Sequence, residues 1–106
     1  MPDIENGSQS LAGLIAYQDG AIVSRTLLSK PAGTVTLFAF DAGQGLSEHT
    51  TPYDALAFAV DGELEISIAA EPHRLGEGQV LLMPANRPHA VQASRRSKML
   101  LIMIRE

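Results

Sequence analysis

Short stretches of β-forming residues follow one another along most of this chain, and glycine, proline or aspartate interrupts them. Within residues 63–69, apolar Leu64, Ile66 and Ile68 alternate with polar neighbours, which is the pattern of a strand with one buried face. Short strands at this spacing predict an all-β fold, an antiparallel sandwich or barrel. We expect strands over residues 21–29, 34–40, 55–60, 63–69, 79–83, 89–93 and 98–105.

The turns between these stretches are marked by residues that favour tight backbone bends. Asp61-Gly62 separates two expected strands by two residues and predicts a hairpin turn. The chain has 106 residues and no linker-like stretch, which indicates one domain. We expect residues 1–19 to form an N-terminal arm with a possible short helical turn, and residues 20–106 to form the β domain. Ser10 is the expected cap of that turn, with Leu11, Leu14 and Ile15 on one side.

Two of the expected strands, residues 55–60 and 98–105, are apolar on both faces. A strand of a small antiparallel sheet usually has one polar face in contact with water. Here both faces require cover, either from a loop or the N-terminal arm, or from a second subunit. Only 19% of the residues are charged, and this low share favours the second subunit, so we expect a homodimer.

Charge and composition exclude several classes of partner and site. The net charge is −4, and the only basic cluster is Arg95, Arg96 and Lys98, which we interpret as a solvated strand end. We therefore expect no binding to nucleic acid or to a membrane. The chain has no cysteine, so disulfides, thiolate metal sites and cysteine nucleophiles are excluded. The first residues lack the basic region and apolar run of a signal peptide, and we expect a cytoplasmic protein.

Two histidines lie within stretches whose spacing is typical of one family. Gly43, His49 and Gly62 match a pattern of glycine, five residues, His-x-His, three or four residues, glutamate, six residues and glycine. A second pattern, of glycine, five residues, Pro-x-Gly, two residues, histidine, three residues and asparagine, is matched at Gly78, Pro84 and His89. In these stretches, and over residues 20–105 as a whole, the chain resembles the cupin family. The resemblance implies an antiparallel jelly-roll β-barrel. Asn86 stands at the turn glycine of the second pattern, and asparagine tolerates a left-handed backbone.

The resemblance also implies a metal site, but this chain departs from it. In metal-binding cupins, two histidines and a glutamate of the first pattern join the histidine of the second. Here Thr51 stands at the second histidine position and Ala55 at the glutamate position. Asp54 and Glu48 are each one residue out of step with the pattern, and such a shift turns a strand side chain to the other face. A bulge at the start of the strand would still let Asp54 reach the site. His49 and His89 therefore remain as a reduced site.

A two-histidine site would bind one divalent ion weakly, or would anchor a polar ligand directly. Imidazole accepts zinc, nickel, iron or copper, and manganese is a further candidate. We expect a pocket at the barrel mouth lined by Thr51, Tyr53, Ala55, Ala57 and Met83. Alternatively, bulky neighbours fill this space, namely Phe38, Phe40, Met83 and Met103. His73 lies in an expected turn or strand edge and is interpreted as solvent-exposed.

Three functions are compatible with these features. The first is a small-molecule-binding cupin whose two-histidine metal or ligand site lies at the barrel mouth. The second is a metal-dependent enzyme of the dioxygenase, isomerase or decarboxylase type that acts on a small polar substrate, as the resemblance implies. The third is a non-catalytic structural or regulatory barrel, which a filled interior between the histidines would favour.

Overall fold

Nine strands and one short 3-10 turn make up the described part of the chain in the computed structural model, which covers residue 4 and residues 7–106. The turn, η1, spans Ala12–Leu14. The strands are β1 (Ile22–Lys30), β2 (Gly33–Phe40), β3 (Gly45–His49), β4 (Asp54–Asp61), β5 (Glu63–Ile68), β6 (Glu71–Gly76), β7 (Val80–Met83), β8 (His89–Gln92) and β9 (Ser97–Ile104). Residues 1–3 and 5–6 of the expected arm lie outside the described residues.

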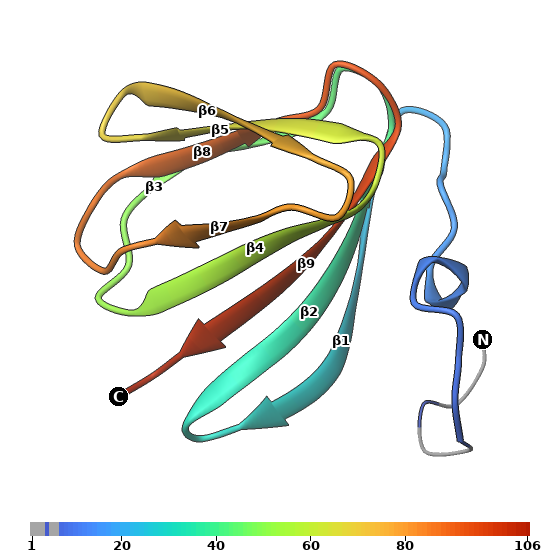
Figure 1. The fold of residues 1–106 in the computed structure, drawn as a ribbon, viewed down its shortest axis with the longest axis horizontal. Helices are drawn as coiled ribbons and strands as arrows, with labels where there is room; N and C mark the ends of the chain where they lie inside the picture. The colour runs from blue at the N-terminus through green and yellow to red at the C-terminus, as the bar shows by residue number, and fades with distance from the viewer. Residues whose placement is uncertain (1–3, 5–6) are drawn as a thin grey trace.

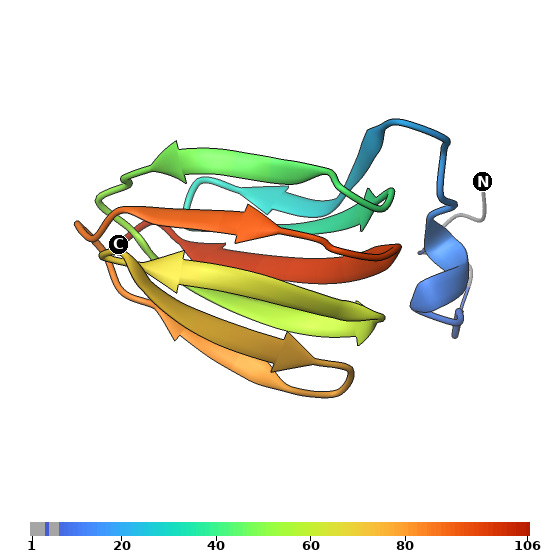
Figure 2. The ribbon, with the colours of Figure 1, turned by 90° about the horizontal axis from the view of Figure 1, so that it is seen from above.

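The strands form two antiparallel sheets that face each other (Figure 1). One sheet has five strands in the order β1-β2-β9-β4-β7, and the other has four in the order β3-β8-β5-β6. Together they make a flattened jelly-roll barrel, seen from above in Figure 2. The predicted all-β antiparallel fold is therefore confirmed. None of the helical turns in the described ranges is long and apolar enough to cross a bilayer.

Side chains from both sheets meet between them and form the main core. Alternate residues of β4 point inward, so that Ala55, Ala57 and Ala59 are almost fully buried. Small residues on this strand leave room for larger side chains from the strands around them. The larger buried members of the core are Phe40, Leu64, Ile66, Ile68, Leu75, Met83, Val91 and Met99.

Two strands were not predicted, and both carry weak sequence signals. β3 reads GLSEH, with three polar residues in five positions, and its last three residues are exposed. β6 reads EPHRLG and lies at the edge of the four-stranded sheet, where proline is tolerated because the side of the strand without a partner needs no N–H donor. Neither strand has the apolar alternation by which half-buried strands are recognised.

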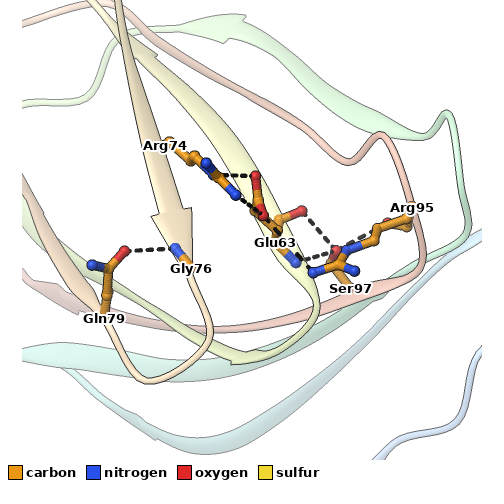
Figure 3. A network of polar contacts seen from close by, with 6 residues as sticks. All are labelled: Glu63, Arg74, Gly76, Gln79, Arg95 and Ser97. Atoms are coloured by element: carbon orange, nitrogen blue, oxygen red, sulfur yellow. Dashed lines mark hydrogen bonds and ion pairs between the residues drawn. The ribbon is translucent and has the colours of Figure 1, made fainter.

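The prediction of a hairpin at Asp61-Gly62 is wrong. β4 pairs with β7 and β9, whereas β5 pairs with β6 and β8, so the chain crosses from one sheet to the other at this point. Gly62 has a φ of 71°, in the left-handed region. The buried hydroxyl of Ser97 accepts a hydrogen bond from the Glu63 backbone N–H (3.0 Å) and lies 2.8 Å from the Glu63 carbonyl oxygen (Figure 3). These bonds tie the crossover to the start of β9.

The N-terminal segment packs on the outer face of the five-stranded sheet, as Figure 1 shows. Leu14 and Ile15 are buried there against Leu37 and Ala39. The expected cap is wrong, because Leu11 is the N-cap residue and no side chain caps the turn. Only the carbonyl of Ser10 takes part, accepting a hydrogen bond from Gly13 N–H (3.0 Å).

Polar contacts hold this segment in place. Lys98 Nζ donates to the carbonyl of Ala12 (2.6 Å), and Tyr17 donates its hydroxyl to Asp61 (2.6 Å). Burial and the Asp61 carboxylate raise the pKa of Tyr17, so this hydroxyl keeps its proton. Arg96 pairs with Asp41 (2.9 Å) and with Asp19. Arg95 and Arg96 are exposed, as expected of a solvated strand end, but Arg96 and Lys98 also fasten the arm to the barrel.

Candidate functional site

The two histidines of the motifs lie on neighbouring strands and directly opposite each other. His49 ends β3, His89 begins β8, and the two are paired in the ladder. The pairing shifts between Leu46 and His49, where β3 has one more residue than β8. Such a bulge changes which residues of a strand share a face. It brings His49, rather than Glu48, opposite His89.

The imidazole rings contact each other through their Nε2 atoms. His49 Nε2 and His89 Nε2 are 3.1 Å apart, and the rings meet edge to face with their centroids 4.3 Å apart. His49 Nδ1 is 2.9 Å from the carbonyl oxygen of Ser47. A carbonyl only accepts, so Nδ1 carries the proton and donates it. In the neutral ring, His49 Nε2 therefore carries a lone pair that points at His89 Nε2 and can accept a hydrogen bond from it.

The two rings differ in their surroundings. His49 is exposed, whereas His89 is only 7% exposed. Burial and the neighbouring His49 lower the pKa of His89, while the Arg87 backbone acts in the opposite direction. Both of the lowering effects disfavour the charged ring, so His89 is neutral around pH 7. Its Nδ1 is buried and finds no partner in hydrogen-bond geometry among the described residues.

The other candidate ligands do not gather around the pair. Asp54 accepts a hydrogen bond from the Ala85 backbone N–H (2.8 Å), which holds the loop between β7 and β8. The Thr51 hydroxyl interacts with the backbone of Tyr53 instead, donating to its carbonyl oxygen (3.2 Å). Among the residues that the structure describes, no three histidine, aspartate or glutamate side chains come together in a metal-binding cluster. The site thus offers two imidazole ligands.

The residues expected to line a pocket divide into two groups. Ala55, Ala57 and Met83 are buried in the core between the sheets, while Thr51 and Tyr53 lie in the connection between β3 and β4. Phe40 is fully buried in the same core, and Phe38 and Met103 pack against it. A surface hollow lies against β3 and β8, but Ser47, Gln92 and their neighbours line it, and neither histidine does.

The sequence analysis missed two features that position the pair. One is the bulge in β3, and the other is the role of the Ser47 carbonyl in orienting His49. A third feature could be predicted from the sequence, since Asn86 stands at a turn position that tolerates a left-handed backbone. In the structure its φ is 66°. Its N–H donates to the Thr51 carbonyl (2.7 Å) and so joins the two loops that flank the histidines. His73 lies apart from these residues, half-buried on the edge strand β6 rather than fully exposed.

Comparison with known proteins agrees with the fold. The family model of the cupin domain matches residues 36–105. A conserved protein of unknown function from Streptococcus pyogenes is 33% identical, with a TM-score of 0.93 over 99% of this chain and 93% of that one. This chain is a cupin.

Further solved structures extend the comparison. A cupin superfamily protein from Desulfitobacterium hafniense is 29% identical and has a TM-score of 0.91, covering 95% of this cupin and 93% of that chain. A cupin 2 conserved barrel domain protein from Leptotrichia buccalis is 38% identical with a TM-score of 0.87. That match covers 90% of this cupin but 46% of the Leptotrichia chain. None of the curated proteins matches.

Proposed function

We propose that this cupin binds one divalent transition-metal ion between His49 Nε2 and His89 Nε2, and that a small polar ligand completes the coordination of the ion. The observation that carries the proposal is the 3.1 Å separation of these two nitrogens. Imidazole nitrogens bind zinc at about 2.0–2.1 Å, so two of them on one ion, at angles between octahedral and tetrahedral, lie about 2.9–3.4 Å apart. The observed separation falls within this range.

The protonation states of the two histidines also support the proposed metal site. A metal-bound histidine commonly donates its other ring N–H to a carbonyl, which fixes the tautomer and the ring orientation. The bond from His49 Nδ1 to the Ser47 carbonyl has this form. Metal binding also requires neutral imidazole, and the lowered pKa of His89 keeps that ring neutral without a metal.

Two protein ligands leave most of the coordination shell open. Catalytic zinc sites usually have three protein ligands, so a two-histidine site binds an ion more weakly and exposes more of it to solvent or to a second molecule. Zinc, nickel, copper and iron all suit imidazole, and an exchangeable manganese site remains among the candidates. When bound, the ion would supply Lewis acidity toward an oxygen donor of that molecule. Binding is the role best supported, because no third acidic or imidazole group in the described ranges joins the pair.

The first test is a calorimetric titration of tag-free protein with Zn²⁺ and Ni²⁺. We expect one ion per chain, and an affinity that drops more than about tenfold in both His49→Ala and His89→Ala, since each removes half of the protein ligands. His73→Ala is the matched control, because His73 is the third histidine of the chain and lies on another strand. Absence of binding, or binding that survives in both site variants, would refute the proposal.

The second test addresses the open coordination positions. The protein is loaded with Co²⁺, whose visible absorption reports coordination, and azide is added as a simple anionic probe. We expect azide to change the spectrum of the wild type, because most of the ligands in this site are exchangeable. A spectrum that stays unchanged at saturating azide would show that no position is open to a ligand.

A further inference from the structure

Two methionines lie on the inner face of the five-stranded sheet, on either side of a small residue. In the ladder, Met83 of β7 and Met103 of β9 are the two direct neighbours of Ala55 on β4. Met83 and Ala55 are 2% and 4% exposed, and Met103 packs against the core cluster that contains both. This part of the barrel interior therefore holds two thioether sulfurs, with only a methyl group on the strand between them.

The connections of the chain place these methionines at the same end of the barrel as the histidine pair. A five-residue loop joins Met83 to His89, and a four-residue loop joins His49 to β4; both loops lie at one end of the sandwich (Figure 1). Ile68, directly beside His89 in the ladder, belongs to the same core cluster as Met83. Facing sheets pack about 10 Å apart, and imidazole and methionine side chains each extend several ångström from the backbone. An ion between the sheets is therefore within reach of both kinds of side chain.

We propose that this end of the barrel is a copper(I) site, in which Met83 and Met103 add thioether ligands from the five-stranded sheet to the imidazoles of His49 and His89. The inference rests on the proposed metal site and names the ion that this site prefers. Thioether sulfur is a soft ligand that selects Cu(I), whereas carboxylates suit harder ions. Among the described residues no acidic side chain and no third histidine joins the pair, so the sulfurs are the further donors that the interior supplies.

Burial and charge favour Cu(I) over a divalent ion in the same place. His89 and Met83 are 7% and 2% exposed, so an ion bound to both loses most of its water. Neutral imidazole and thioether ligands carry no charge, and nothing in this ligand set neutralises the ion. The cost of burying a charge in apolar surroundings rises steeply with its size. A monovalent ion therefore costs less to bury here than Zn²⁺ or Ni²⁺.

The test is a competition for Cu(I), measured without oxygen and in the presence of ascorbate, against the coloured chelator bathocuproine disulfonate. We expect the wild type to take up one Cu(I) per chain. Met83→Leu and Met103→Leu each remove a sulfur but nearly keep the volume of the side chain. Each should lower the Cu(I) affinity about tenfold or more, because a soft ligand is lost. The Ni²⁺ affinity of the same variants should stay within about twofold of the wild type, because imidazole is the ligand that suits nickel.

Met99→Leu is the matched control. It makes the same exchange on the same face of β9, four residues from Met103 and so about 13 Å away along the strand. We expect both affinities to remain unchanged in this variant, and circular dichroism should show that all variants keep the β fold. X-ray absorption of the Cu(I)-loaded wild type should show sulfur neighbours at about 2.3 Å, and the double variant Met83→Leu/Met103→Leu should lose them.

The outcomes separate this inference from the metal site on which it rests. A Cu(I) affinity that is unchanged in one methionine variant removes that methionine from the site, and an unchanged affinity in both overturns the inference. A copper spectrum without sulfur neighbours, while Ni²⁺ still binds through His49 and His89, overturns it too and leaves the two-histidine site in place. A wild type that binds neither Ni²⁺ nor Cu(I) refutes the metal site itself.

Discussion

Substitution of Gly62 by alanine tests how the chain crosses between the two sheets. Gly62 has a φ of 71°, and a β-carbon built there would lie 2.9 Å from Ser97 Cα and closer still to the Arg96 carbonyl oxygen and Ser97 Oγ. Gly78 has a similar φ of 84°, but a β-carbon there would meet nothing within 4 Å. The two alanine variants therefore share a backbone cost and differ in the steric clash.

The expected magnitudes follow from these two contributions. A left-handed backbone costs a non-glycine residue about 1–2 kcal/mol, which is the whole effect expected for Gly78→Ala. In Gly62→Ala, the crossover must also move away from β9, and this disturbs the hydrogen bonds between Ser97 and Glu63. Each lost bond costs about 1 kcal/mol. We therefore expect Gly62→Ala to lower the free energy of unfolding by about 3–4 kcal/mol.

Urea denaturation followed by circular dichroism measures both variants at one protein concentration, since association would shift the midpoint. With a slope of about 1–1.5 kcal/mol per molar urea, the midpoint should fall by about 2–4 M for Gly62→Ala and by about 1–2 M for Gly78→Ala. The result that would refute this reasoning is equal destabilisation by the two substitutions. It would mean that the clash at Gly62 is relieved without loss of the Ser97 bonds.

Three further predictions concern a strained turn, the N-terminal arm and the histidine pair. Ala70, with a φ of 68° in the β5–β6 turn, should gain about 0.5–1 kcal/mol of stability when replaced by glycine, as thermal unfolding will show. Tyr17→Phe should cost about 1–2 kcal/mol in denaturant unfolding, because Asp61 loses its 2.6 Å hydrogen bond; an unchanged midpoint would mean that the arm is held by its apolar contacts alone. The pKa of His89 lies below 6.5 in the folded state, so the unfolded chain binds more protons as the pH falls through 6.5, and the stability of the metal-free protein should decrease there. Unfolding curves above and below this pH test it, and His89→Asn should weaken the dependence.

Much of the fold could be predicted from local patterns. The alternation of Leu64, Ile66 and Ile68 marked a half-buried strand, and all three side chains are buried in the core. β3 and β6 were missed because exposed, polar strands at or near a sheet edge need little apolar alternation. The hairpin at Gly62 was mispredicted because an Asp-Gly sequence between two strands does not determine whether those strands pair with each other or with other strands.

The candidate site shows the same division between local and non-local information. The resemblance of the two motifs to those of cupins implied that His49 and His89 would meet, and the ladder pairs them directly. What placed His49 rather than Glu48 opposite His89 is the extra residue in β3, which changes the face that each side chain occupies. A bulge forms where two strands from distant parts of the chain must fit together, so the residues of β3 alone do not reveal it.

By itself, the sequence determined the class of the fold, which depends on side-chain identity and on the two-residue period of a strand, both of which are local. Its resemblance to the cupin motifs implied the positions of the two site histidines, and that Thr51 and Ala55 stand where metal-binding cupins have ligands. Only the tertiary structure decided that the chain changes sheets at Gly62 and that the arm covers just one end of the outer face of the five-stranded sheet. These outcomes depend on strand pairing and packing between residues far apart in sequence. The local pattern of apolar residues shows which strand faces must be covered, but it does not specify which part of the chain covers them.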